Sequence, residues 1–308
     1  MCSKKHEPEN LVSADSGFTR QELYLLNTKL PHDLNPADME MAWAGYQAVI
    51  GQLLIRMGTE NRLFDSMARV ALVSSLDGVY ARLALIPKLS SSAIHAIRNH
   101  GIATLIDRVA GECMLMELSA AAGYRTFCFP ALIKGLMKTG KMKDRSVDRM
   151  MDTFEFLNTM MQHPFNDSRV LEQIERTNEL HSRYKVAGAM HPEARNLFKY
   201  IALNMFYIGP MMRPDLTPRE RHAICGLTVL VAQRMGHIIE GSVLELEAFI
   251  ADYEATRMFG RDDDSALRQR AVEIAKASKK ALDRIPTILP ARIHGYVPYR
   301  VKKILELE

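Results

Sequence analysis

The sequence predicts an all-α protein, a globular bundle of about a dozen helices. Helix-capping residues and glycines at expected helix ends recur along the chain. No alternation of apolar and polar residues persists long enough to indicate a strand. The 308 residues are 47% hydrophobic and 25% charged, which is the composition of a globular protein that buries a large core.

Prolines and capping residues locate the helix boundaries. Asn35-Pro36 predicts the start of a helix that closes at Gly58. Thr217-Pro218-Arg219-Glu220 is a capping box with proline at the first helical position, so it predicts another helix start. Further helix ends are expected at four glycines, namely Gly101, Gly123, Gly140 and Gly260.

Three of the expected helices are apolar on several sides. They cover residues 145–163, 197–209 and 223–233. Helices of this kind lie inside a bundle, where ligand pockets also form. The 19 methionines favour irregular core packing, and the alternative is that they line an adaptable cavity.

The patterning divides the chain into three parts. Residues 1–16 are polar and are expected to form a disordered arm, and residues 17–285 are expected to form one helical domain. Residues 286–308 are expected to form a basic tail, because after Pro286 two further prolines and a glycine interrupt any long helix. No pattern indicates an oligomeric state.

The net charge of +4 is too small to indicate a nucleic-acid partner. Residues 265–308 contain ten Lys and Arg against four Asp and Glu, a local net charge of +6. One hypothesis is weak peripheral contact with an anionic membrane, worth about 1 kcal/mol per cation. A solvated helix face is the favoured alternative. The cations concerned are Lys276, Lys279, Lys280, Arg284, Arg300, Lys302 and Lys303.

A cytoplasmic location is expected from the cysteines and from the hydropathy pattern. Cys2, Cys113, Cys128 and Cys225 lie far apart and form no C-x-x-C, so neither a disulfide framework nor a zinc knuckle is predicted. The first residues lack the apolar core of a signal peptide. No run reaches the roughly 18 apolar residues of a transmembrane helix.

Several motif-defined chemistries are excluded. The chain has no H-E-x-x-H, and no Glu stands three residues before a His, which argues against zincin and ferritin-like metal sites. It has no G-x-S-x-G, no P-loop and no G-x-G-x-x-G. Nucleophile-elbow hydrolysis, nucleotide hydrolysis and Rossmann-type cofactor binding are therefore not supported.

Among the ten histidines, His181 is distinguished by its neighbours in the stretch RTNELHSRYKV. Residues three and four positions away on a helix share its side, and here they include Thr177 and Asn178. Upstream, Arg149 and Thr153 lie four residues apart in an otherwise apolar helix. Buried polar groups of this kind need partners, although an Arg that reaches solvent and a Thr bonded to its own helix are the simpler interpretation.

The ordered set DRMMDTFEFL, RTNELHSRYKV and LTPRERHAICGLTVLVAQRMGHIIEG resembles the MpaB and rubber oxygenase catalytic-domain family, over roughly residues 129–241. The resemblance implies a helical oxidoreductase that binds haem b and adds O2 to a small hydrophobic, isoprenoid-like or unsaturated substrate. It makes His181 the iron ligand and places Arg149 and Thr153 in the haem pocket as catalytic residues. Arg176 becomes a candidate partner for a haem propionate, and Asn178 a candidate acceptor for the second imidazole nitrogen of His181.

Two departures from the family's pattern argue against rubber cleavage itself. Asp152 stands where the rubber-cleaving members have a lysine, and residues 124–143 contain no Asp or Glu to match their catalytic carboxylate. Another oxidation, a peroxygenase-like reaction or a non-catalytic haem role is then also compatible with the resemblance. The alternative hypotheses are a non-catalytic helical binding protein for haem or an apolar ligand, and a helical interaction protein without a pocket.

Overall fold

The computed structural model describes residues 18–60, 91–139, 146–185, 192–260, 263–283 and 290–307. These residues are mostly helical, and among them the only extended pairing is an isolated antiparallel bridge between Lys29 and Ser242. The prediction of an all-α fold is confirmed. The expected disordered arm at residues 1–16 lies outside the described residues.

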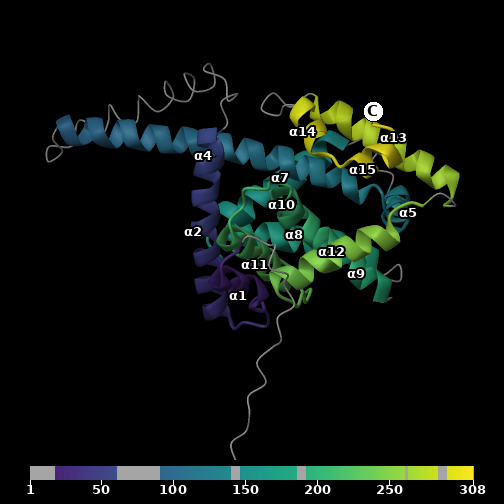
Figure 1. The fold of residues 1–308 in the computed structure, drawn as a ribbon, viewed down its shortest axis with the longest axis horizontal. Coiled ribbons are helices and arrows are strands. Elements are labelled where there is room, and N and C mark those ends of the chain that lie inside the picture. Colours follow the sequence, from purple (N-terminus) through teal and green to yellow (C-terminus); the bar gives the residue numbers. More distant parts are fainter. Residues whose placement is uncertain are drawn as a thin grey trace, which may run out of the picture.

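The helices cross one another in several directions around a common core (Figure 1). In chain order they are α1 Arg20–Asn27, α2 Pro36–Glu60, α4 Ser91–Thr126, α5 Pro130–Thr139, α7 Ser146–Gln162, α8 Ser168–Lys185, α9 Pro192–Leu203, the π-helix η1 Asn204–Ile208, α10 Gly209–Met211, α11 Pro218–Arg234, α12 Val243–Arg257, α13 Ser265–Leu282, α14 Pro290–Tyr296 and α15 Tyr299–Leu305.

The predicted helix starts at Pro36 and Pro218 are confirmed. The Asn35 side chain accepts a hydrogen bond from the Asp38 amide over 3.0 Å and so caps α2. In the capping box of α11, the Thr217 hydroxyl accepts from the Glu220 amide over 3.3 Å, and the Glu220 carboxylate accepts from the Thr217 amide over 2.9 Å.

The expected helix ends at Gly101 and Gly123 were wrong, because both glycines lie inside α4. A glycine within a helix costs about 1 kcal/mol relative to alanine, which does not by itself end a helix whose apolar face is buried. Near Gly123, Leu118, Ala121 and Ala122 of α4 are fully buried, so tertiary packing there outweighs that cost. Gly140 lies outside the described residues, and α12 ends at Arg257, three residues before Gly260.

Glycine instead serves the contact between α2 and α4, which meet as a T in Figure 1. A Cβ added to Gly111 of α4 would lie 1.8 Å from the Leu54 carbonyl oxygen of α2. A Cβ added to Gly58 of α2 would lie 1.6 Å from the Asp107 carbonyl oxygen of α4. The two backbones therefore touch directly, and each helix supplies a glycine where the other crosses it.

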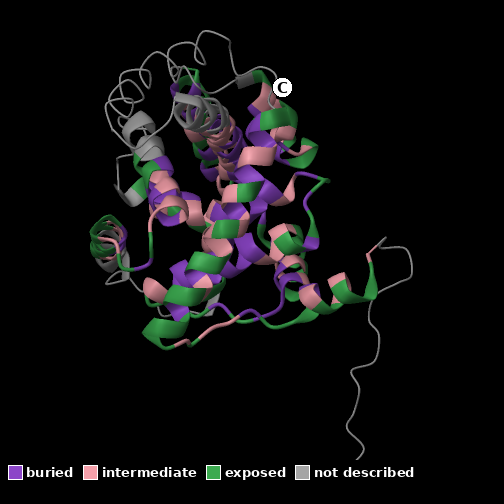
Figure 2. Cartoon of the chain, turned by 90° about the vertical axis from the view of Figure 1, so that its left-hand side faces the viewer, coloured by how far each residue is buried: buried purple, intermediate pink, exposed green. Residues whose placement is uncertain are grey.

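The three helices predicted to be central lie in the core. They correspond to α7, to the continuous segment α9–η1–α10, and to α11. In α11, every residue from Ala223 to Ala232 is buried, which matches its all-round apolar sequence. Buried residues gather where the helices face one another, and exposed residues lie outward (Figure 2).

The C-terminal segment belongs to the bundle, so the expected boundary at residue 286 does not separate a free tail. α14 packs on α4, and α15 packs on α13. Val301, Leu305 and Leu307 are buried, and Arg292 forms an ion pair of 3.0 Å with the buried Glu117 of α4. The apolar positions that follow Pro290 and Pro298 therefore reach the core through two short helices.

Most of the cations named for this segment are exposed on α13 and α15. Lys276 pairs with Glu306 at 3.5 Å, and Arg284 lies outside the described residues. Within the part of the chain that the structure describes, no helix is both long enough and apolar enough to span a bilayer.

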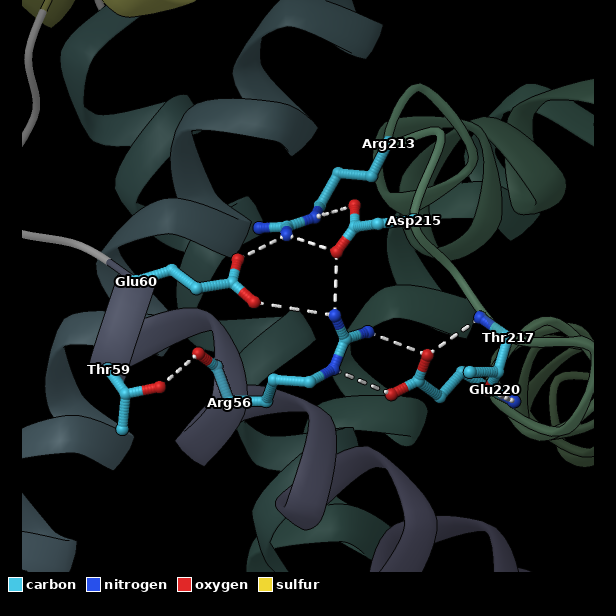
Figure 3. A network of polar contacts seen from close by, with 7 residues as sticks. All are labelled: Arg56, Thr59, Glu60, Arg213, Asp215, Thr217 and Glu220. Atoms are coloured by element: carbon cyan, nitrogen blue, oxygen red, sulfur yellow. Dashed lines mark hydrogen bonds and ion pairs between the residues drawn. The ribbon is translucent and has the colours of Figure 1, made fainter.

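A polar network joins the end of α2 to the connection between α10 and α11 (Figure 3). Arg56 donates to Asp215 over 2.6 Å and to Glu220 over 2.7 Å. The buried Arg213 also binds Asp215 and reaches Glu60. Hydrogen bonds from Arg213 hold the pKa of the Asp215 carboxyl well below its usual range. The network fixes the C-terminal end of α2 beside the capping box of α11.

Candidate functional site

A pocket of about 360 Å³ lies among α4, α5, α7, α9, η1 and α13. It forms because α13 packs on both α5 and α7, while η1 packs on both α4 and α9. Its volume falls within the range of small-molecule sites, which is about 300–1,000 Å³. The residues that form it come from positions 119 to 282 of the chain, so it exists only in the folded protein.

The wall of the pocket is mainly apolar. Its apolar and small members are Ala120, Gly123, Phe127, Ala131, Leu132, Gly135, Leu136, Phe154, Leu157, Leu197, Phe198, Ile201, Met205 and Leu282. Among the described residues, no Asp, Glu, Lys, Arg or His lines it. This composition suits an uncharged hydrophobic molecule, because burying an unpaired charge is costly.

Six side chains add polar atoms to this wall, namely Ser119, Tyr124, Thr126, Thr153, Asn204 and Ser278. The Thr126 hydroxyl donates to the Gly123 carbonyl oxygen over 2.6 Å. Burial raises the pKa of the Tyr124 phenol well above its usual range, so this side chain stays neutral at physiological pH. The described polar groups of the wall are therefore neutral.

Asn204 differs from the other polar groups of the wall. It is 3% exposed, and its side-chain oxygen Oδ1 has no hydrogen-bond partner in the structure. It is the first residue of η1, where the wider turn of a π-helix interrupts the regular helix and often marks a functional site. A buried amide oxygen without a donor costs about 1–3 kcal/mol.

Of the predicted site residues, Thr153 lines the pocket from α7. Arg149 lies one helical turn before it on α7, and His181 lies on the last turn and a half of α8, but both side chains are outside the described part of the structure. α7 packs against α8, so the structure brings together the two helices that carry the predicted site.

The remaining two predicted residues lie on α8. Arg176 is 57% exposed and forms an ion pair of 3.4 Å with Asp152 of α7, and it does not line the pocket. The side-chain oxygen of Asn178 is buried and has no hydrogen-bond partner in the structure. Asn178 therefore offers an acceptor without a donor, three residues before His181.

Sequence reasoning missed Asn204, Ser119 and Ser278 as pocket residues. One signal was available for Asn204, which is one of two strongly polar residues in the apolar stretch 197–209. No comparable signal marked Ser119 or Ser278, because serine is common in helices and only the packing of α13 near α4 makes them part of one wall.

Away from the pocket, two similar clusters link the segment α9–η1 to α12, and each consists of a tyrosine, a glutamate and an arginine. The Tyr200 hydroxyl donates to Glu254 over 2.7 Å, and Arg125 approaches the same carboxylate at 2.6 Å. The second cluster lies seven residues away in both α9–η1 and α12, and in it the Tyr207 hydroxyl donates to Glu247. Arg221 then pairs with Glu247 at 3.4 Å. Burial raises the pKa values of both tyrosines, with Glu254 and Glu247 as further causes.

The described cysteines lie outside the pocket wall. Cys113, Cys128 and Cys225 are buried free thiols, and burial raises the pKa of Cys113 to about 11 and that of Cys128 to about 12. Thiols of this kind are unreactive. Within the described ranges, no group of three or more His, Cys, Asp or Glu side chains is arranged to hold a metal ion.

Comparison with protein-family models, with curated proteins and with solved structures finds no significant match.

Proposed function

We propose that this protein is a haem b-dependent oxidoreductase that uses O2 on a small hydrophobic molecule held in the pocket. The observation that carries the proposal is the position of Thr153, which lines an apolar pocket of about 360 Å³ from α7, the helix that packs against α8. The resemblance to the MpaB and rubber oxygenase family led us to expect this threonine in the haem pocket. It also assigns the iron ligand to α8.

The chemistry of the available groups suits haem b. The porphyrin is largely apolar, and so is the described pocket wall. An imidazole that binds iron through one nitrogen needs an acceptor for its other N–H, and the buried oxygen of Asn178 has no other donor. Arg176 is exposed, so it suits a propionate at the surface better than any group inside the pocket.

In this proposal each residue has a defined task. His181 holds the iron, Asn178 fixes the orientation of its imidazole, and Thr153 contributes a hydroxyl to the pocket wall. Arg149, one turn before Thr153, would supply a positive charge to the haem pocket. Bound haem b supplies the activation of O2. The described wall holds no carboxylate or imidazole, so its own residues bind and orient the substrate and exclude water.

The absorption spectrum of the purified protein tests this proposal. We expect a Soret band and a positive pyridine haemochromogen assay, with both lost in His181→Ala. His32→Ala is the matched control, because His32 contacts the Leu30 carbonyl oxygen on the α1–α2 connection and does not line the pocket. A colourless protein that haemin does not reconstitute would contradict the proposal.

A second candidate function is binding of an apolar ligand without catalysis. It is favoured by the pocket wall, whose described residues include no charged side chain and no nucleophile of raised reactivity. We expect in this case a colourless protein from which organic solvent extracts an apolar compound in near-stoichiometric amount. Mass spectrometry of the extract identifies that compound, and an oxygen electrode distinguishes the two candidates by detecting O2 consumption.

A further inference from the structure

Ser278 is the polar exception on the buried face of α13. The other buried residues of this helix are all apolar, and together they form the face that packs on the bundle. The buried residues of α13 are Leu267, Ala271, Val272, Ala275, Ser278, Ala281 and Leu282. A hydroxyl in this position needs a partner, because a buried polar group without one costs about 1–3 kcal/mol.

The Ser278 hydroxyl forms no hydrogen bond with any of the residues that the structure describes. A serine or threonine inside a helix can donate to the carbonyl oxygen four positions earlier. Thr228 of α11 does so, because its hydroxyl donates to the Ile224 carbonyl oxygen over 2.8 Å. Ser278 does not use the corresponding carbonyl of Ile274, so its proton is free for a partner outside the helix.

The Ser278 oxygen is open to the pocket. The residue lines the pocket wall and is 6% exposed, and its oxygen retains accessible surface. The side-chain oxygen of Asn204 on the same wall is fully enclosed. A molecule in the pocket can therefore reach the hydroxyl of Ser278, although it cannot reach the oxygen of Asn204.

We infer that the ligand of this pocket is an apolar molecule with an oxygen atom that accepts a hydrogen bond from the Ser278 hydroxyl. The inference rests on the proposed use of the pocket as a ligand site, and it names the class of molecule. Ketones, esters and alcohols carry such an oxygen, whereas a pure hydrocarbon does not. Ser278 is then a specificity-determining residue that favours an oxygenated ligand, while the apolar wall binds the rest of the molecule.

The test compares 2-octanone with 2-methyl-1-octene, in which a methylene group replaces the carbonyl oxygen. Both compounds are titrated as competitors against the fluorescent probe N-phenyl-1-naphthylamine bound to the full-length protein. The alkene is the more hydrophobic compound, so neither dissociation constant alone reports the hydrogen bond. The ratio of the two constants, compared between wild type and variant, isolates the contribution of the hydroxyl.

Ser278→Ala removes the hydroxyl and retains a good helix former. We expect this variant to weaken binding of 2-octanone relative to the alkene by about fivefold, which is the effect of one hydrogen bond. Ser265→Ala is the matched control and should leave the ratio unchanged, because Ser265 begins the same helix, is exposed and does not line the pocket. Ser119→Ala should change the ratio by less than about twofold, because Ser119 is a half-buried member of the wall whose hydroxyl can bond to water.

An unchanged ratio in Ser278→Ala would overturn the inference, as would an equal change in Ser119→Ala. If neither compound displaces the probe from the wild-type protein, the pocket is not a ligand site and the inference fails with it. Weaker haemin binding by Ser278→Ala at an unchanged ratio would assign the hydroxyl to a haem propionate and also contradict the inference. The Soret band of each preparation is measured separately, so failure of the haem proposal is distinguishable from loss of the ketone preference.

Discussion

Gly111 and Gly123, two of the three glycines of α4, lie in opposite environments on one helix. At Gly111, a Cβ would lie 1.8 Å from the Leu54 carbonyl oxygen of α2. At Gly123, a Cβ would meet no heavy atom within 4 Å, and the residue lines the pocket. Less than four helical turns separate backbone contact from open space. At Gly111 the helix therefore packs directly against the backbone of α2, and at Gly123 it forms part of the pocket wall.

Buried polar groups of the segment α9–η1 also differ from one another, because some have hydrogen-bond partners and one does not. On the α12 side, Tyr200 and Tyr207 each donate to a carboxylate that also pairs with an arginine. The buried Asn204 oxygen, between these two tyrosines in sequence, has no hydrogen-bond partner in the described part of the structure. Completed pairs stabilise the bundle, whereas a buried oxygen without a donor costs about 1–3 kcal/mol.

The largest effect is expected where the backbones touch. Gly111→Ala forces α2 and α4 apart, because its Cβ would overlap the Leu54 carbonyl group and not a flexible side chain. We expect the free energy of unfolding to fall by more than about 4 kcal/mol, which is the range of severe core disruption. Urea denaturation followed by far-UV circular dichroism measures this, and a loss below about 1 kcal/mol would contradict the close junction.

A smaller loss of free energy of unfolding is expected where Tyr200 and Arg125 share the Glu254 carboxylate. Glu254→Ala leaves Arg125 and the Tyr200 hydroxyl without their shared acceptor, at a cost of about 3 kcal/mol. Tyr200→Phe removes one donor and keeps the ion pair, so it should cost only about 1 kcal/mol. If urea denaturation gave the same loss of free energy of unfolding for both variants, the ion pair of Arg125 would contribute nothing to stability.

The network of Figure 3 gives a pH-dependent effect of about 1 kcal/mol, because its groups are partly exposed. The folded-state pKa of Asp215 is lowered, so its contribution is fully present above the unfolded pKa of about 4 and is lost as pH falls through the folded-state pKa. Asp215→Asn should therefore destabilise the protein by a constant amount at neutral pH. The difference from wild type should shrink only in strong acid, as thermal denaturation across pH would show.

The smallest expected effect is an increase in the free energy of unfolding. Gly123→Ala places a methyl group in open space and removes a mid-helix glycine, so the free energy of unfolding should rise by about 0.5–1 kcal/mol. The same methyl group narrows the pocket and should weaken direct binding of an apolar fluorescent probe such as N-phenyl-1-naphthylamine. A destabilisation by Gly123→Ala in urea denaturation would mean that the space beside this glycine is filled.

Much of the local structure was predictable. The capping residues at Asn35 and Thr217 and the apolar helices at 145–163, 197–209 and 223–233 depend on neighbours within a few positions, and all five predictions are confirmed. Within the candidate site, the family resemblance led us to expect Thr153 in a haem pocket, and Thr153 lines the described pocket from α7.

Predictions that depended on distant contacts were weaker. Gly101 and Gly123 looked like helix ends, because nothing in their neighbourhood reveals that α4 continues through both of them. The C-terminal segment looked like a tail, because its prolines break the local pattern, yet Val301 and Leu305 reach the core.

The sequence by itself determined the helical class, the helix starts at Pro36 and Pro218 and the ordered motif on α7 and α8, because capping and apolar periodicity act over one or two turns. Only the tertiary structure decided which glycine of α4 touches another backbone and which faces open space. It also decided that Asn204 would be left without a donor. The physical reason is that a pocket is a space left between helices, and its walls come from residues that no local pattern connects.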